Sequence, residues 1–130
     1  MANPNIVSVT SIKGESLGYN LTNTTTTTLL TVSADKVLKV NRITVANVDG
    51  TNAATFDLSI VKANYTPDGV ANFDTSGTFF LAKTISVPAD ATLVVLDTPI
   101  YLMEGDILKG GASAASDLDL FISYEVINDA

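Results

Sequence analysis

Apolar and polar residues alternate through the C-terminal stretch 118–126, which reads LDLFISYEV. Every second position is large and apolar, and this set comprises Leu118, Leu120, Ile122, Tyr124 and Val126. The positions between them are polar, except for Phe121. A period of two places the two sets on opposite faces of a β-strand. A single strand cannot bury its apolar face alone, so this pattern predicts a sheet in a layered fold.

Similar short patterns recur along the chain, and none has the 3.6-residue period of a helix. Further strands are predicted at 5–12, 20–32, 37–48, 55–61, 79–87 and 92–96, with shorter pieces at 100–103 and 107–109. Eight or nine strands at spacings of roughly 8 to 12 residues are typical of an all-β sandwich. The sequence therefore predicts one domain over 1–130, an antiparallel β-sandwich of jelly-roll-like form.

Two segments are predicted to form sheet edges. The run Thr24–Thr28 favours an extended strand because Thr is β-branched, and its hydroxyls suit an exposed position. The C-terminal strand is the second candidate edge. Exposed edges need protection from open-ended pairing, and an oligomer interface is one way to provide it.

The parity of the apolar positions changes within the predicted strand 37–48. Leu38 and Val40 have one parity, and Ile43 and Val45 have the other. One extra residue near Asn41–Arg42 would place all four side chains on the core face, which predicts a β-bulge there. Arg42, the only Arg in the chain, is expected either to pair with a carboxylate or to anchor a partner.

Other segments have predicted faces and turns. One buried face comprises Phe56, Leu58 and Ile60, with Asp57 and Ser59 pointing outward. A second buried face comprises Phe79, Leu81, Ile85 and Val87, and strand 92–96 is expected to be covered on both sides. Turns or loops are expected at 13–15, at Gly18, at 47–55 as a hairpin loop, at 104–106 and at 110–116.

Composition narrows the possible functions. The chain contains no Cys, His or Trp, which excludes disulfides, thiolate nucleophiles and imidazole bases. Its net charge of −7 argues against binding to nucleic acid or to an anionic membrane surface. The N-terminal residues lack the pattern of a secretory signal, and no apolar run has the length of a membrane helix.

Candidate catalytic groups are few. A nucleophilic Ser has no His to activate it. Two carboxylate pairs are explained more simply as a solvated face and a turn than as a glycosidase site. Calcium binds oxygen ligands, and these could be supplied by Asp68 with Asp74 or by Asp117 with Asp119. Neither set has the spacing of an EF-hand. We therefore expect no enzyme, metal or cofactor. The carboxylate pairs are Asp117 with Asp119 and Glu104 with Asp106.

Turn-forming residues interrupt the strand pattern from Asn64 to Gly77. A loop of this length that carries aromatic residues is typical of a binding segment. Tyr65 and Phe73 are expected either to contact a partner or to fold back and cap one end of the core.

Four stretches resemble small structural proteins carried by tailed phages of marine bacteria, notably cyanophages. They are MANPNIVSVTSI, VANVDGTNAATFDLSI, TISVPADATLVVLDTPIYLMEGDILKG and SDLDLFISYEVI. The resemblance covers roughly half of the chain. It lies in the sequences of predicted strands and turns and includes no catalytic motif. It implies a virion component that is made in the host cytoplasm, and it supplies no functional residues.

The resemblance and the residue patterns together lead to one expectation and two alternatives. The expected function is a capsid decoration or cement protein on the surface of a phage particle, forming a trimer or another small oligomer. Its expected partners are the major capsid protein or other virion proteins. The alternatives are a tail or neck component, and a carbohydrate-binding module that stacks Tyr65 and Phe73 on sugar rings. Expected contacts lie in the N-terminal segment 1–12, the Thr-rich run and the long loop: Asn5, Ile6, Val7, Thr24, Thr26, Thr28, Tyr65 and Phe73.

Overall fold

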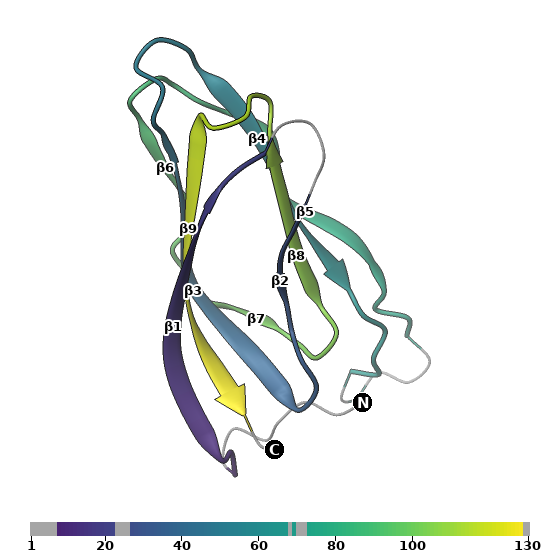
Figure 1. Ribbon diagram of the computed structural model, residues 1–130. Helices are drawn as coiled ribbons and strands as arrows, with labels where there is room; N and C mark the ends of the chain where they lie inside the picture. Colours follow the sequence, from purple (N-terminus) through teal and green to yellow (C-terminus); the bar gives the residue numbers. More distant parts are fainter. Residues whose placement is uncertain (1–7, 23–26, 68, 70–72, 129–130) are drawn as a thin grey trace.

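The computed structural model describes residues 8–22, 27–67, 69 and 73–128 (Figure 1). Within these ranges the chain forms nine β-strands in two antiparallel sheets, which confirms the predicted all-β class. The strands are β1 (Ser11–Asn20), β2 (Thr27–Thr31), β3 (Lys36–Asn47), β4 (Ala54–Lys62), β5 (Gly77–Val87), β6 (Thr92–Leu96), β7 (Ile100–Leu102), β8 (Ile107–Ala112) and β9 (Leu118–Asn128).

The strands pair in a nested order. β1 pairs with β9, β2 with β8, β3 with β6 and β4 with β5, so the chain resembles one long hairpin. This hairpin is rolled up, because β9 also pairs with β3 and β8 also pairs with β4. The result is a five-stranded sheet, β1-β9-β3-β6 with β7 beside β3, and a four-stranded sheet, β2-β8-β4-β5. This topology is a jelly roll.

The core lies between the two sheets. Alternating residues of β9 fill it from one side, and Leu118, Leu120 and Ile122 are at most 1% exposed. Phe56 and Leu58 of β4 face them from the other sheet and are buried as predicted. Fully burying one such side chain contributes about 1.5–3 kcal/mol, so the alternating pattern is the main source of stability.

The predicted bulge in β3 is present. Val40 lies opposite Tyr124 of β9, whereas Arg42 lies opposite Ser123, so Asn41 is the extra residue. The apolar residues on both sides of the bulge are buried, as the change in parity predicted: Leu38, Val40, Ile43 and Val45.

The first strand differs from the prediction. β1 spans Ser11–Asn20 and contains the residues Lys13–Glu15 and Gly18 that were expected to form turns. Every residue of β1 lies opposite a residue of β9, from Asn128 back to Asp119. An edge strand held by backbone pairing does not need strict apolar alternation, so polar residues and glycines are accommodated here. Most of the predicted strand 5–12 lies outside the described residues.

Three connections also correct the predictions. The segment 47–55 joins β3 to β4, which belong to different sheets, so it is a crossover and not a hairpin loop. Gly110 and Gly111 belong to β8 instead of a loop, and a Cβ atom at Gly110 would approach Leu29 Cδ1 to 2.9 Å. Ser59, expected to point outward, is 2% exposed.

Edge positions were predicted correctly for one of two strands. β2, which contains the end of the Thr-rich run, is an edge of the four-stranded sheet. β9 is not an edge, because it lies between β1 and β3. Its strongly apolar face is better explained by this central position, where the opposite sheet covers it.

Candidate interaction surfaces

Strand β5 carries the first cluster of exposed apolar side chains. Phe79, Phe80, Leu81 and Ile85 are 56%, 47%, 37% and 40% exposed. Phe79 and Phe80 are consecutive in a regularly paired segment and point to opposite faces, so these four residues, called the β5 surface below, line both faces of this edge strand. This finding corrects the prediction that Phe79, Leu81 and Ile85 lie in the core. On β5, only Ala82 and Val87 are buried.

Two bulges explain the difference. Ala82 lies opposite Leu58 and Phe80 lies opposite Ser59, so Leu81 is an extra residue on β5. A second irregularity follows before Ile85, where Thr84 has a positive φ of 52°. The Thr84 N–H donates to Asp57 Oδ1 at 2.6 Å, which fixes this second bulge. Each extra residue shifts the faces of the strand and breaks the alternation seen in the sequence.

The outer face of the five-stranded sheet carries the second cluster. Phe121 of β9 lies opposite Thr44 of β3, which in turn lies opposite Val94 of β6. Phe121 and Val94 are 52% and 41% exposed, so strand 92–96 is not covered on both sides as predicted. On the other side, Gly18 of β1 lies opposite Phe121, and a Cβ atom there would lie 3.5 Å from the ring.

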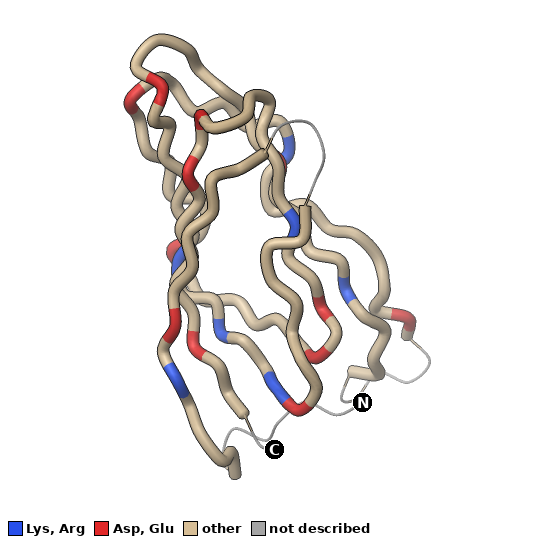
Figure 2. The backbone as a smooth tube through the Cα atoms, viewed as in Figure 1, with Lys and Arg blue, Asp and Glu red and all other residues tan. Residues whose placement is uncertain are grey.

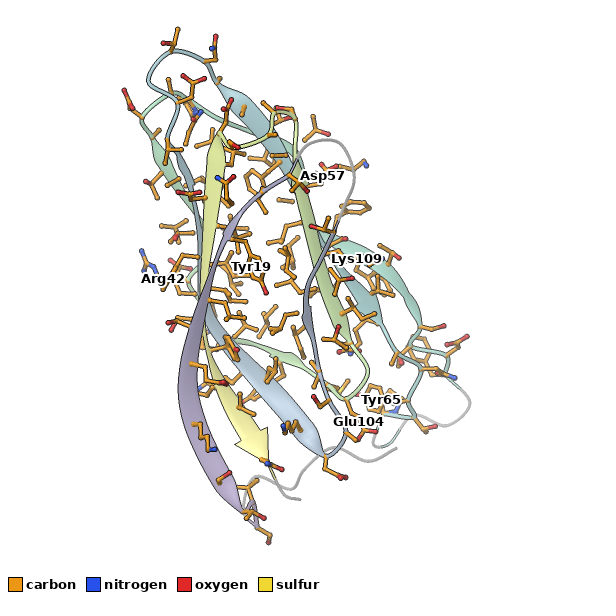
Figure 3. The ribbon with its side chains drawn as sticks, in the orientation of Figure 1. Tyr19, Arg42, Asp57, Tyr65, Glu104 and Lys109 are labelled. Carbon is orange, nitrogen blue, oxygen red and sulfur yellow. The ribbon has the colours of Figure 1, made fainter. Side chains whose placement is uncertain are left out.

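Arg42 extends this second cluster. It follows the β3 bulge, precedes Thr44 by two residues on the same strand, and projects away from the sandwich (Figure 3). Arg42 is exposed, and no ion pair with a carboxylate is found for it within the described part of the chain. Arg and Phe are among the residues enriched in protein interfaces, and together Phe121, Val94 and Arg42 are called the sheet surface below.

Charge is sparse on the β5 surface, whereas the sheet surface contains Arg42 and has charged neighbours (Figure 2). Lys83 is the only charged residue of β5, and its Nζ lies 4.4 Å from the centre of the Phe80 ring. Beside the sheet surface, Lys39 pairs with Glu125 at 3.8 Å, and Asn41 Nδ2 donates to the same carboxylate at 3.2 Å. The net charge of −7 is therefore carried mainly elsewhere.

The loop between β4 and β5 is organised by Thr75. Its Oγ1 accepts from the Tyr65 N–H at 2.9 Å and donates to the Ala63 carbonyl at 2.8 Å. Tyr65 is half-buried, with Lys62 Nζ 5.6 Å from the centre of its ring. Phe73 is 56% exposed. The two aromatic residues thus differ in exposure, and only Phe73 presents most of its ring to solvent.

Asp106 lies in the turn between β7 and β8 and connects this turn to the end of β4. Glu104 of the same turn and Tyr65 are labelled at this end of the molecule in Figure 3. The Asp106 side chain is fully buried and accepts from Lys62 Nζ at 2.7 Å and from the Ala63 N–H at 2.9 Å. The Met103 N–H donates to the same carboxylate at 2.8 Å. The carboxylate therefore connects the end of β4 to the turn between β7 and β8. The sequence marked this turn but gave no sign of the buried ion pair.

The other candidate carboxylates also have local partners. Glu104 Oε2 accepts from the Asp35 N–H at 3.1 Å, and Asp119 Oδ1 accepts from Asn20 Nδ2 at 2.7 Å. Asp74 accepts from the N–H and hydroxyl of Ser76, and these bonds lower the pKa of Asp74. In the part of the chain that the structure describes, no group of three or more acidic, His or Cys residues could hold a metal ion.

The predicted contact residues fall into two groups. Thr28 is exposed on the edge strand β2, and Tyr65 and Phe73 lie in the loop described above. The other five lie outside the described residues: Asn5, Ile6, Val7, Thr24 and Thr26. The β5 and sheet surfaces were not among the predicted contacts.

Comparisons with known proteins give distant likenesses. No protein-family model and no curated protein sequence matches the chain. A solved structure of Bacillus endospore appendages, described as disulfide-linked pili, is similar with 14% identity and a TM-score of 0.44, covering 92% of this chain and 88% of that one. The VP2 subviral particle of infectious bursal disease virus is similar with 14% identity and a TM-score of 0.41.

This second likeness covers 92% of the present chain and 33% of the viral one, so the chain spans about one third of that protein's length. Identities this low carry no information on function. Separately, none of the described residues belongs to a helix that could cross a membrane.

Proposed function

We propose that this chain is a virion structural protein, and specifically a capsid decoration or cement protein of a tailed phage. It binds the outer surface of the head and bridges neighbouring capsid subunits. The observation that carries the proposal is the presence of two separate apolar surfaces, on β5 and on the five-stranded sheet. A protein that bridges neighbours needs two contact surfaces, and large exposed apolar residues grouped in this way mark protein interfaces.

The energetics suit a repeating lattice. Each surface exposes only three or four large side chains, so a single contact is modest. Many copies on a lattice, or a linked oligomer that binds through several copies at once, gain affinity through effective concentration. The sparse charge on the β5 surface keeps the cost of removing ions from water low there, and Arg42 gives the sheet surface a cation that can pair with a carboxylate of the partner.

Catalysis has little support in the same geometry. Asp106 is held by Lys62 and by backbone N–H groups, and Asp119 is held by Asn20. These carboxylates have structural partners that explain their positions, so the proposed role is that of a non-enzymatic component.

Location and copy number in purified particles test the proposal. Quantitative mass spectrometry with cryo-electron microscopy should find the protein on the head in hundreds of copies. A few dozen copies or fewer at one vertex would instead support the tail or neck alternative. Complete absence from the particles would overturn both.

A variant tests the role of the sheet surface. Phe121→Glu places a charge at the centre of that surface and should strongly reduce binding to particles that lack the protein. Val48→Glu is the matched control, because Val48 is 55% exposed and lies in the crossover before β4. Equal binding by both variants would show that the sheet surface is not the contact.

A further inference from the structure

A pocket of about 160 Å³ lies between the two sheets, beside their edge strands β1 and β2 (Figure 1). Its apolar walls come from both sheets. Leu38 and Val126 lie opposite each other on β3 and β9, and Leu30 and Val32 lie at and just after the end of β2. All four side chains belong to the hydrophobic core or pack against it, so the pocket opens onto the core.

Tyr124 supplies this pocket with a polar group that has no partner. It is 5% exposed, and its hydroxyl makes no hydrogen bond with the residues that the structure describes. In the same part of the chain no fully buried side-chain nitrogen or oxygen lacks a hydrogen-bond partner, so this hydroxyl reaches the space of the pocket. Burial, followed by the charge of Glu15, raises the pKa of Tyr124, so the hydroxyl keeps its proton at neutral pH. It can both donate to a ligand and accept from it.

Two opposite charges flank the pocket. Glu15 of β1 lies directly opposite Tyr124, and Lys36 is the first residue of β3. Neither forms an ion pair with the other or with any further described residue. A cationic ligand would be repelled by Lys36 and an anionic one by Glu15. The pair therefore favours a neutral ligand.

Size, wall and charge together define the ligand. A cavity of about 150 Å³ can hold one benzene ring. The phenol ring of a tyrosine matches the apolar walls, is neutral, and carries a hydroxyl that can pair with the free hydroxyl of Tyr124. A phenylalanine would leave that hydroxyl without a partner, and a lysine would bring a cation beside Lys36.

We propose that this pocket takes up a single tyrosine side chain of a capsid protein, with a hydrogen bond between its hydroxyl and that of Tyr124. The proposal rests on the proposed function in naming a capsid protein as the partner. A buried aromatic anchor in a fitted pocket is the kind of contact that dominates interface energies. It adds a specific contact to the apolar β5 and sheet surfaces.

Three small molecules, each equivalent to one side chain, test the ligand class: p-cresol for tyrosine, toluene for phenylalanine and n-butylammonium for lysine. Nuclear magnetic resonance titrations of the labelled protein measure each Kd. p-Cresol should bind about two- to tenfold more tightly than toluene, which is the contribution of one hydrogen bond. Equal binding of these two, tighter binding of n-butylammonium, or no shift at the pocket residues would overturn the proposal.

Two conservative variants test the role of the hydroxyl. Tyr124→Phe should fold normally, bind toluene as the wild type does and lose the preference for p-cresol. Tyr101→Phe is the matched control, because Tyr101 is 53% exposed on β7 and does not line the pocket. It should keep the preference. A preference that survives in Tyr124→Phe would show that the hydroxyl does not hold the ligand.

A filled pocket tests the capsid contact. Val126→Phe places a ring of this chain in the pocket and should bind particles that lack the protein at least roughly tenfold less tightly, as for an interface hot spot. Val48→Phe, on the exposed crossover, should bind as the wild type does. Thermal melts check that both fold, and Tyr124→Phe should weaken particle binding in the same direction without changing the core. Undiminished binding by the folded Val126→Phe and Tyr124→Phe variants would overturn the tyrosine anchor and leave the proposed function standing. No binding by the wild-type protein would overturn both.

Discussion

Asp106 should be one of the most sensitive positions for stability. Asp106→Ala deletes three accepted hydrogen bonds, removes the partner of Lys62 and leaves the Ala63 N–H without its acceptor. Breaking a buried ion pair by removing one partner costs about 3–5 kcal/mol. The Lys62 side chain is 20% exposed and can reach water, so the lower end of that range is expected. Total stability is only about 5–15 kcal/mol, so this loss is a large share.

Urea unfolding at neutral pH, followed by far-ultraviolet circular dichroism, measures the effect. The midpoint should fall with little change in slope, and the melting temperature should drop by about 10–20 °C. Glu104→Ala is the matched control in the same turn, because its one described bond to Asp35 is exposed. A loss below about 1 kcal/mol for Asp106→Ala, or equal losses for both variants, would refute the structural role of the buried pair.

Three further predictions use the same assay. Gly110→Ala should cost about 1–3 kcal/mol because its Cβ would meet Leu29 Cδ1 at 2.9 Å, whereas Gly14→Ala, with open space around it, should not destabilise. Tyr19→Phe removes the hydroxyl that donates to the Leu29 carbonyl between the sheets and should cost about 0.5–1.5 kcal/mol. The Thr51 N–H donates to the Asp49 carboxylate and is the main cause of a pKa lowered from the usual 3.8. Asp49→Ala should therefore reduce the stability at neutral pH, where the wild-type carboxylate is charged. It should cause no loss at a pH well below 3.8, where the carboxyl of the folded wild-type protein is also protonated. An equal loss at both pH values, or equal costs for the two glycines, would contradict these arguments.

The sequence was informative wherever burial controls the side chains. The change of parity around Asn41 predicted the β3 bulge, because the apolar residues on both sides of it, Val40 and Ile43, have to reach the core. β9 was recognised from its alternation for the same reason. Its central place in the sheet was missed, since pairing order depends on long-range contacts that leave no mark on local periodicity.

The edge strands and the interaction surfaces were harder to predict. In β5, the apolar residues alternate almost regularly, so the sequence does not indicate the bulges at Leu81 and Thr84. Residues that are exposed in the structure were therefore predicted to be buried. In β1, backbone pairing to β9 holds polar residues and glycines that resemble a turn. In the aromatic loop Phe73 is exposed, but most of the large exposed apolar side chains lie on strands.

The nested order of the strands has a consequence for synthesis. β9 leaves the ribosome after the other eight described strands, and it has to insert between β1 and β3, two strands made much earlier. Until then the edges of both older strands are available to wrong partners, and slow assembly from distant segments prolongs that exposure. Production at low temperature or with chaperones should therefore raise the yield of native protein more than substitutions on the surface of the folded protein.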